Sequence, residues 1–265
     1  MNTENQKILT AQYPDVWPVN DADTEKAQAL AAHLGSRVLH SREEAAQRSV
    51  WLKLDDGGLA LTDGKLELTG NFTDLLPRLK QGRLQTELLV KAAKIRGAAG
   101  EPTAVDATAG MGEDSLLLAA AGFRVLLIEH DPVIAALLRD TMERAALEPE
   151  LRDIISRMTL LEGDSLRELT ALSYRPDVVY LDPMFPERQK SALIKKKFQL
   201  LHLLERPCGE EEELLQAALA AGPRKIIIKR PLKGPLLAGM KPGYVMKGKA
   251  VRYDCIVPPP RPEEK

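Results

Sequence analysis

The chain has little cysteine, few aromatic residues and almost no net charge. Its 265 residues include two cysteines and 4% aromatic residues, and 37 basic against 38 acidic residues leave a formal net charge of −1. Cys208 and Cys255 are far apart and have no nearby His cluster, so we expect neither a disulfide framework nor a metal site. There is no hydrophobic run of membrane-spanning length and no signal-peptide pattern at the start. These absences predict a cytoplasmic protein without a membrane partner, on which any basic surface is local.

What the chain does have is a regular alternation of short apolar segments and amphipathic segments in residues 76–265. This pattern is typical of a parallel α/β sheet. The expected strands are Thr103 to Thr108, Arg124 to His130, Met158 to Asp164, Pro176 to Asp182 and Arg224 to Arg230. The expected helices begin near Gln85, Glu113, Pro132 and Glu211. Tyr244 to Met246 and Ala250 to Val257 predict a C-terminal antiparallel hairpin.

Residues 1–75 have a different pattern and are expected to form a small α+β region. A helix is predicted over Thr24 to Leu34, followed by short strands near residues 50–54, 59–62 and 66–69. Asp-Asp-Gly-Gly and Asp-Gly segments between them indicate tight turns. The division predicted from sequence is therefore at about residue 75.

A glycine-containing loop follows the first strand of the α/β region. It begins at Asp106 and continues through Gly110 and Gly112 into a helix whose first residues are Glu113 and Asp114. The glycines let a ligand approach the backbone, but the third glycine of a dinucleotide fingerprint is missing and two carboxylates would repel a pyrophosphate. The loop therefore predicts a cationic ligand without phosphate, and S-adenosylmethionine has this chemistry.

Acidic residues also end the second and third strands of this region. Glu129 lies twenty-three residues after Asp106, where a carboxylate can accept hydrogen bonds from ribose hydroxyls. His130 is expected to contribute only its backbone. Asp164, with Ser165 beside it, ends the third strand, where a carboxylate can meet the adenine amino group. Since open α/β sheets bind ligands at the carboxyl ends of their strands, these positions favour one shared cofactor site.

The fourth strand ends in a second motif, Asp182-Pro183-Met184-Phe185. An Asp-Pro-x-aromatic sequence here resembles the motif of methyltransferases that act on amino groups of nucleic-acid bases. The lone pair of such an amine is delocalised into the ring, and it is localised when a carboxylate and a carbonyl accept the amine hydrogens. We expect Asp182 and the Pro183 carbonyl to be these acceptors, and Phe185 to stack on the base.

Basic residues follow this motif directly. They can neutralise phosphates that flank a target nucleotide, although a charge run is more often a solvated face. The predicted RNA-binding residues are Arg188, Lys190, Lys195, Lys196 and Lys197. For a further basic group around the fifth strand, binding and a solvated face are equally good explanations: Arg224, Lys225, Lys229, Arg230 and Lys233.

Together, DATAGMGEDSLLLAAAGFRVLLIEHDPVIAALL and VVYLDPMFPERQKSALIKKK closely resemble the bacterial small-subunit rRNA guanine-N2 methyltransferase family of the RsmJ type. The resemblance implies a Rossmann-like class I methyltransferase fold, with S-adenosylmethionine as cofactor. It implies N2-methylation of one guanosine, with 16S rRNA or the small ribosomal subunit as partner. The family often has other residue types at the positions of Glu113, His130 and Asp164, so a side-chain role there stays open. The implied cofactor contacts are Glu113, Asp114, Glu129, His130, Asp164, Ser165 and Asp182.

Two alternatives stay open at this point. An Asp-Pro-x-aromatic loop can also serve an adenine-N6 methyltransferase acting on RNA or DNA, although such enzymes commonly have Pro where this chain has Met184. A non-catalytic RNA-binding assembly factor could also keep the fold. The sequence predicts neither the position of the target nucleotide nor the oligomeric state.

Overall fold

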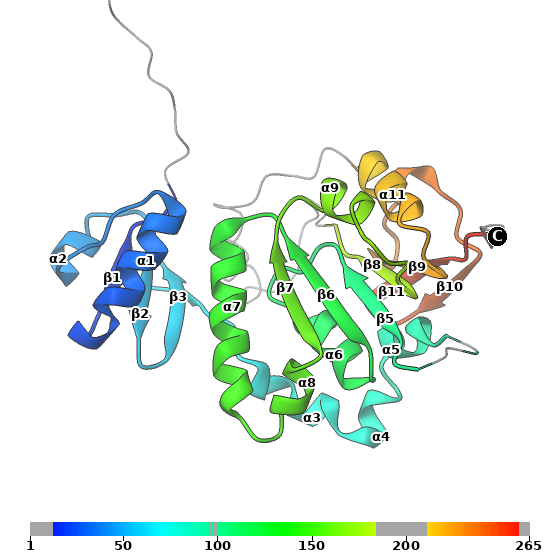
Figure 1. Ribbon diagram of the computed structural model, residues 1–265, viewed down its shortest axis with the longest axis horizontal. Helices are drawn as coiled ribbons and strands as arrows, with labels where there is room; N and C mark the ends of the chain where they lie inside the picture. Colours follow the sequence, from blue (N-terminus) through cyan, green and yellow to red (C-terminus); the bar gives the residue numbers. More distant parts are fainter. Residues whose placement is uncertain (1–12, 96, 98–99, 184–210, 260–265) are drawn as a thin grey trace, which may run out of the picture. The chain divides into compact units, whose positions relative to one another are not determined.

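The structure is a computed structural model, and it describes residues 13–95, 97, 100–183 and 211–259. These residues form two compact units, residues 13–69 and the described residues from Gly70 onward. Figure 1 shows the elements of both units. In the described part of the chain, no helix has the length and apolar character needed to span a bilayer.

The N-terminal unit is a small sheet with helices. Its described strands follow the order β1 (Val16–Pro18), β2 (Trp51–Asp55), β3 (Gly58–Thr62) and β4 (Glu67–Leu68). β1 pairs with β2 in parallel, and the other pairs are antiparallel. The predicted helix is confirmed as α1 (Thr24–Leu34), preceded by a 3-10 turn at Asp21–Asp23 and followed by α2 (Arg42–Ala45). β1 was not predicted, because three residues carry no alternation that could reveal a strand.

The second unit contains a mostly parallel sheet of seven described strands, in the order β10-β11-β9-β8-β5-β6-β7. The strands β5 to β9 run parallel to one another. β10 and β11 form an antiparallel hairpin, and β11 pairs antiparallel with β9. The predicted strands and the hairpin are therefore confirmed. Their bounds are β5 (Thr103–Asp106), β6 (Arg124–Glu129), β7 (Met158–Glu162), β8 (Val178–Leu181), β9 (Lys225–Pro231), β10 (Tyr244–Lys247) and β11 (Val251–Ile256).

Helices cover both faces of this sheet, because successive strand residues point to opposite sides. Val178 and Tyr180 belong to the core on one face, and Val179 and Leu181 to the core on the other. The first face is covered by α5 (Leu88–Ala93), α6 (Glu113–Ala120), α7 (Pro132–Leu147) and α8 (Arg152–Ile155). The second is covered by α9 (Ser165–Thr170), α11 (Glu211–Ala220) and a 3-10 turn at Leu237–Gly239.

Short helical segments lead into the sheet and were not predicted. They are a 3-10 turn at Phe72–Leu75, α3 (Leu76–Leu79) and α4 (Gln81–Leu84). The helix expected from Gln85 begins at Leu88. Segments of four residues make little more than one turn, so their apolar residues show no helical period.

The hairpin is tied to the end of β9 by a buried arginine. The Arg252 guanidinium forms an ion pair with Asp254 at 2.9 Å. It also donates to the carbonyls of Pro231, Leu232 and Gly234. Arg252 thereby links β11 to the backbone carbonyls of the turn that leaves β9.

The order of the strands reverses between β5 and β8. From β5 the chain adds β6 and then β7 on one side, and it later returns to place β8 and β9 on the other side of β5. Loops that leave adjacent strands in opposite directions open a crevice at their carboxyl ends, where α/β sheets of this type bind ligands. The Asp106 loop and Asp182 both lie at this edge of the sheet.

Candidate active site

Asp106 anchors the loop that follows β5. Its side chain is 1% exposed, and its carboxylate accepts hydrogen bonds from the Ser115 hydroxyl at 2.6 Å and from the Thr108 N–H at 3.1 Å. Burial raises the pKa of this carboxyl to about 7, and the hydrogen bonds only partly oppose the effect. The structure therefore places Asp106 behind the loop, where it fixes the loop conformation. Its predicted place in the cofactor site then depends on the loop rather than on an exposed side chain.

The two glycines have different functions in this loop. Gly110 has a φ of 52° and donates its N–H to Glu129 Oε2 at 2.8 Å, which joins the β5 and β6 loops. Gly112 has a φ of 75°, and a Cβ there would lie 2.6 Å from Leu138 Cδ1. Gly112 is thus required where helix α6 starts close against α7.

Glu129 ends β6 and lies between two loops. Besides the bond from Gly110, its Oε1 accepts the N–H of Asp131 at 2.9 Å. Burial raises the pKa of Glu129, and these backbone N–H groups lower it in part. His130 is exposed, and Asp131 caps α7 by accepting the N–H groups of Val133 and Ile134. The Glu129 carboxylate therefore has a fixed orientation at the carboxyl edge, as the ribose role requires.

Asp164 and Ser165 connect the end of β7 to helix α9. Asp164 accepts the N–H of Leu166 at 2.9 Å and caps the helix. Ser165 donates its hydroxyl to the carbonyl of Ala107 at 2.6 Å and is nearly buried. Ser165 thus ties the end of β7 to the β5 loop, which brings the first three predicted strand ends into one site.

Asp182 lies at the end of β8, next to the β5 loop. Its N–H donates to Thr108 Oγ1 at 2.7 Å, and its side chain is 37% exposed to solvent. Burial raises the pKa of Asp182, while the Lys229 ammonium at 2.9 Å from Oδ2 lowers it. Pro183 follows and is buried. The predicted catalytic carboxylate therefore lies at the crevice, partly exposed and beside a cation.

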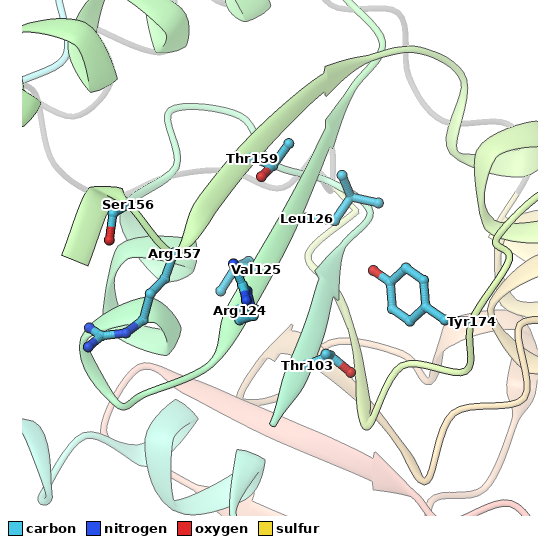
Figure 2. A pocket seen from close by; sticks show the side chains of 8 residues that line it. All are labelled: Thr103, Arg124, Val125, Leu126, Ser156, Arg157, Thr159 and Tyr174. Carbon is cyan, nitrogen blue, oxygen red and sulfur yellow. The ribbon is translucent and has the colours of Figure 1, made fainter. Parts of the chain in front are cut away.

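A cavity of about 390 Å³ is lined by Lys229, the ion-pair partner of Asp182. Its lining includes Asp114, Lys229 and Tyr253, together with the exposed Glu113. A second cavity of about 340 Å³ lies at the amino ends of β5, β6 and β7, and Figure 2 shows its lining side chains. That cavity is at the opposite edge of the sheet from Asp182. The cavity beside Lys229 is therefore the one that extends the predicted site.

The residues at the carboxyl edge suit S-adenosylmethionine. Asp114, Glu129, Asp164 and Asp182 place carboxylates around the β5 loop, and carboxylates attract a ligand with a sulfonium and an amino group. Glu129 is oriented by two backbone N–H groups, as an acceptor for hydroxyls should be. Among the described residues, no group of His, Cys, Asp and Glu could hold a metal ion.

Several predicted residues cannot be placed. Phe185 and the five predicted RNA-binding residues lie outside the described part of the chain: Arg188, Lys190, Lys195, Lys196 and Lys197. Their roles stay predictions from sequence.

Three residues of the site were not predicted. Thr108 holds the Asp182 backbone, Lys229 pairs with the Asp182 carboxylate, and Tyr180 bonds Asp114. Lys229 belonged to a basic group with no assigned role. The signal for Tyr180 was present, because a phenol in a central strand needs a polar partner when it is buried. Nothing in the sequence identified that partner.

Comparisons with known proteins identify the family of this chain. A family model described as "Putative SAM-dependent methyltransferase" matches residues 36–258. The chain is 41% identical to ribosomal RNA small subunit methyltransferase J of Thioalkalivibrio sulfidiphilus, over 88% of this chain and 93% of the relative. It is 44% identical to the protein of the same name from Pseudomonas aeruginosa, over 67% of this chain and 68% of the relative.

A solved structure supports the fold as well. The crystal structure of a SAM-dependent methyltransferase from Neisseria gonorrhoeae aligns with a TM-score of 0.73 at 30% identity, covering 92% of this chain and 96% of the other. The Rossmann-like class I fold and the cofactor predicted from sequence are therefore confirmed. The chain belongs to the family of SAM-dependent methyltransferases that contains ribosomal RNA small subunit methyltransferase J, and S-adenosylmethionine is its cofactor.

Proposed function

We propose that the chain methylates the exocyclic N2 of a guanosine in 16S rRNA of the small ribosomal subunit. The names of its relatives support a small-subunit rRNA substrate. The observation that carries the proposal is the position of Asp182, partly exposed at the strand-order reversal and oriented from two sides by Thr108 and Lys229. An acceptor held in this way is what a weakly nucleophilic amine requires.

The cofactor supplies a methyl group bound to a positively charged sulfur. Asp182 accepts a hydrogen of the guanine amino group, and the Pro183 carbonyl accepts the other. This would localise the lone pair on N2, which could then attack the methyl group that the bound cofactor would supply. As the N–C bond forms and the S–C bond breaks, the nitrogen becomes positive, and the Asp182 carboxylate stabilises that charge.

The residues around β5 hold the cofactor in this proposal. Glu129 accepts hydrogen bonds from the ribose hydroxyls, and Asp164 meets the adenine amino group. Gly110 and Gly112 allow the ligand close to the backbone, and Asp106 keeps their loop in shape. Direct transfer needs no covalent intermediate with the protein, so neither cysteine has a role as a nucleophile.

The product nucleoside tests this proposal. Purified protein and labelled cofactor should be incubated with 16S rRNA and with small subunits from a strain that lacks the endogenous activity. We expect label in N2-methylguanosine after digestion to nucleosides, and a comparison of the two substrates identifies the preferred one. The same RNA from a strain that retains the activity is the matched control and should take no label. Label in N6-methyladenosine, or no label at all, would contradict the proposal.

A further inference from the structure

Lys229 lies between two carboxylates that come from different elements. Its Nζ is 2.9 Å from Asp182 Oδ2 and 2.7 Å from Asp114 Oδ2. The Tyr180 hydroxyl donates to the same Asp114 oxygen at 2.5 Å. We call these four residues the Lys229 network. It connects the first turn of α6, the end of β8 and β9 through side chains alone.

The burial of the Lys229 network distinguishes it from an ordinary surface ion pair. The side chains of Lys229 and Asp114 are 25% and 19% exposed, and Tyr180 is fully buried. Exposed ion pairs contribute little, because water screens them and flexible side chains lose entropy. Inside this network water screens the charges less, so the Lys229 ammonium attracts both carboxylates strongly.

We propose that Lys229 is a positioning residue for methyl transfer: it orients the Asp182 carboxylate, keeps it ionised, and couples it to the cofactor loop through Asp114. This inference rests on the proposed function, in which Asp182 accepts the amine hydrogen. Because Lys229 bonds Oδ2, it directs Oδ1 of Asp182 toward the substrate amine.

The charges around Asp182 determine in which direction its pKa moves when Lys229 or Asp114 is replaced. Burial raises the pKa of Asp182, Lys229 and Arg230 lower it, and Asp114 raises it. Among the described residues, several titratable groups act electrostatically on Asp182: Lys229 and Arg230 on β9, Asp114 on α6, Asp106 on β5, Tyr253 on β11 and Tyr180 on β8. Removing Lys229 should therefore raise the pKa of Asp182, and removing Asp114 should lower it.

Lys229 itself cannot be the base. Burial acts to lower its pKa, but the two carboxylates outweigh that effect and raise the pKa above its usual range. The ammonium thus stays protonated at neutral pH and cannot take the proton that leaves the methylated nitrogen. That proton passes to Asp182 or to water, and Lys229 acts only through Asp182.

The pH dependence of saturated turnover tests this role. In Lys229→Met we expect the acid limb of the kcat profile to move to higher pH, since below the limb each unit of pKa increase lowers the ionised fraction of Asp182 about tenfold. Lys229→Arg keeps the charge and should return the limb toward its original position. In Asp114→Asn the limb should move to lower pH.

A matched control is available on the same strand. Lys225 begins β9, and its Nζ donates to the carbonyls of Ala92 and Lys94, far from Asp182 along the strand. Lys225→Met should reduce the thermal midpoint of unfolding without moving the acid limb. If Lys229→Met fails to fold, the acid limb of Asp114→Asn tests the proposal by itself, because a purely structural role of Lys229 predicts no shift of that limb to lower pH.

The two proposals fail in different ways. An acid limb that stays in place in Lys229→Met or in Asp114→Asn, while Asp182→Asn is slow, overturns the role of Lys229 and leaves the proposed function standing. Normal turnover in Asp182→Asn removes the proposed function first.

Discussion

At the scale of single residues, Asp106 shows how a motif residue can support a site from behind the loop without facing the ligand. The motif predicts a cofactor contact, but one carboxylate oxygen of Asp106 accepts from Thr108 in the loop and the other from Ser115 in α6. Burial is the dominant cause of its raised pKa of about 7. Such a group makes the stability of the fold depend on pH, because its proton affinity differs between the folded and unfolded chain.

We predict that Asp106→Asn removes the part of the pH dependence of folding stability that comes from the Asp106 carboxyl. The folded pKa of about 7 lies above the ordinary value of 3.8, so the neutral carboxyl stabilises the fold fully below about pH 4. That contribution is lost as the pH rises toward 7, at no more than about 1.4 kcal/mol per pH unit. Asn is neutral at every pH and can still bond Thr108 and Ser115.

Urea unfolding of both proteins between pH 4 and 8 measures this difference. The free energy of unfolding of the original protein minus that of Asp106→Asn should fall steadily up to about pH 7 and then level off. A constant difference across this range means that Asp106 is ionised throughout, against the interpretation of its burial.

The sequence predicted some residues of the site and missed others for a physical reason. Glu129 and Asp182 were predicted because a strand end and a short motif are local features. Lys229 and Thr108 were missed, because their roles exist only once β8, β9 and the β5 loop are adjacent. A lysine among other basic residues has no local mark that distinguishes an ion-pair partner from a solvated cation.

At the scale of elements, the junction between the β5 loop and α6 is a packing contact as well as a binding loop. A Cβ at Gly112 would approach Leu138 Cδ1 at 2.6 Å and Phe72 Cζ at 3.2 Å. Both neighbours are buried and belong to the core that covers this face of the sheet. The helix therefore starts at a position that only glycine can occupy without moving the core.

We predict that Gly112→Ala is clearly more destabilising than Gly110→Ala. Both residues have positive φ, and for alanine this conformation costs about 1–2 kcal/mol. At Gly110 the nearest atom to a new Cβ is Thr108 O at 4.0 Å, so no further cost is expected. At Gly112 overpacking adds about 1–3 kcal/mol. Chemical denaturation of the two variants gives the comparison, and equal losses would show that the core yields to the extra methyl group.

Elements that carry a continuous apolar run or a helical period were predictable from sequence, including the four-residue strand β8. The strands of the second unit and α7 carry continuous apolar or periodic patterns, and the structure confirms them. β1 includes Pro18, which is atypical of a strand, and α3 and α4 are four-residue turns that are too short to show a helical period. Their existence depends on contacts with distant segments, as in the parallel pairing of β1 with β2.

At the scale of the whole molecule, the strand order explains why motifs far apart in sequence share one site. Two strands and four helices lie between β5 and β8 along the chain, yet β5 and β8 are neighbours in the sheet. The alternation of strands and helices predicts a parallel sheet, but it does not specify which strands are adjacent. The adjacency of β5 and β8 is therefore known only from the structure.

RNA binding by the basic segment of this chain stays a prediction from sequence. The global charge of −1 does not favour a polyanion, so binding depends on local basic residues. The segment predicted for that role, from Arg188 to Lys197, lies outside the described residues. The chemistry proposed for Asp182 does not depend on it.

Saturated turnover of Asp182→Asn is the most direct test of the central claim that this carboxylate activates the amine. Asn keeps the size of the side chain and one acceptor oxygen, but it loses the charge that stabilises the developing positive nitrogen. With S-adenosylmethionine and rRNA both saturating, we expect kcat to fall on the order of a hundredfold or more, while RNA affinity stays within a few-fold. Cofactor affinity is measured separately by calorimetry, so that a binding defect is not mistaken for a catalytic one. Near-normal turnover at saturation would contradict the account, because Asp182 would then only end the strand.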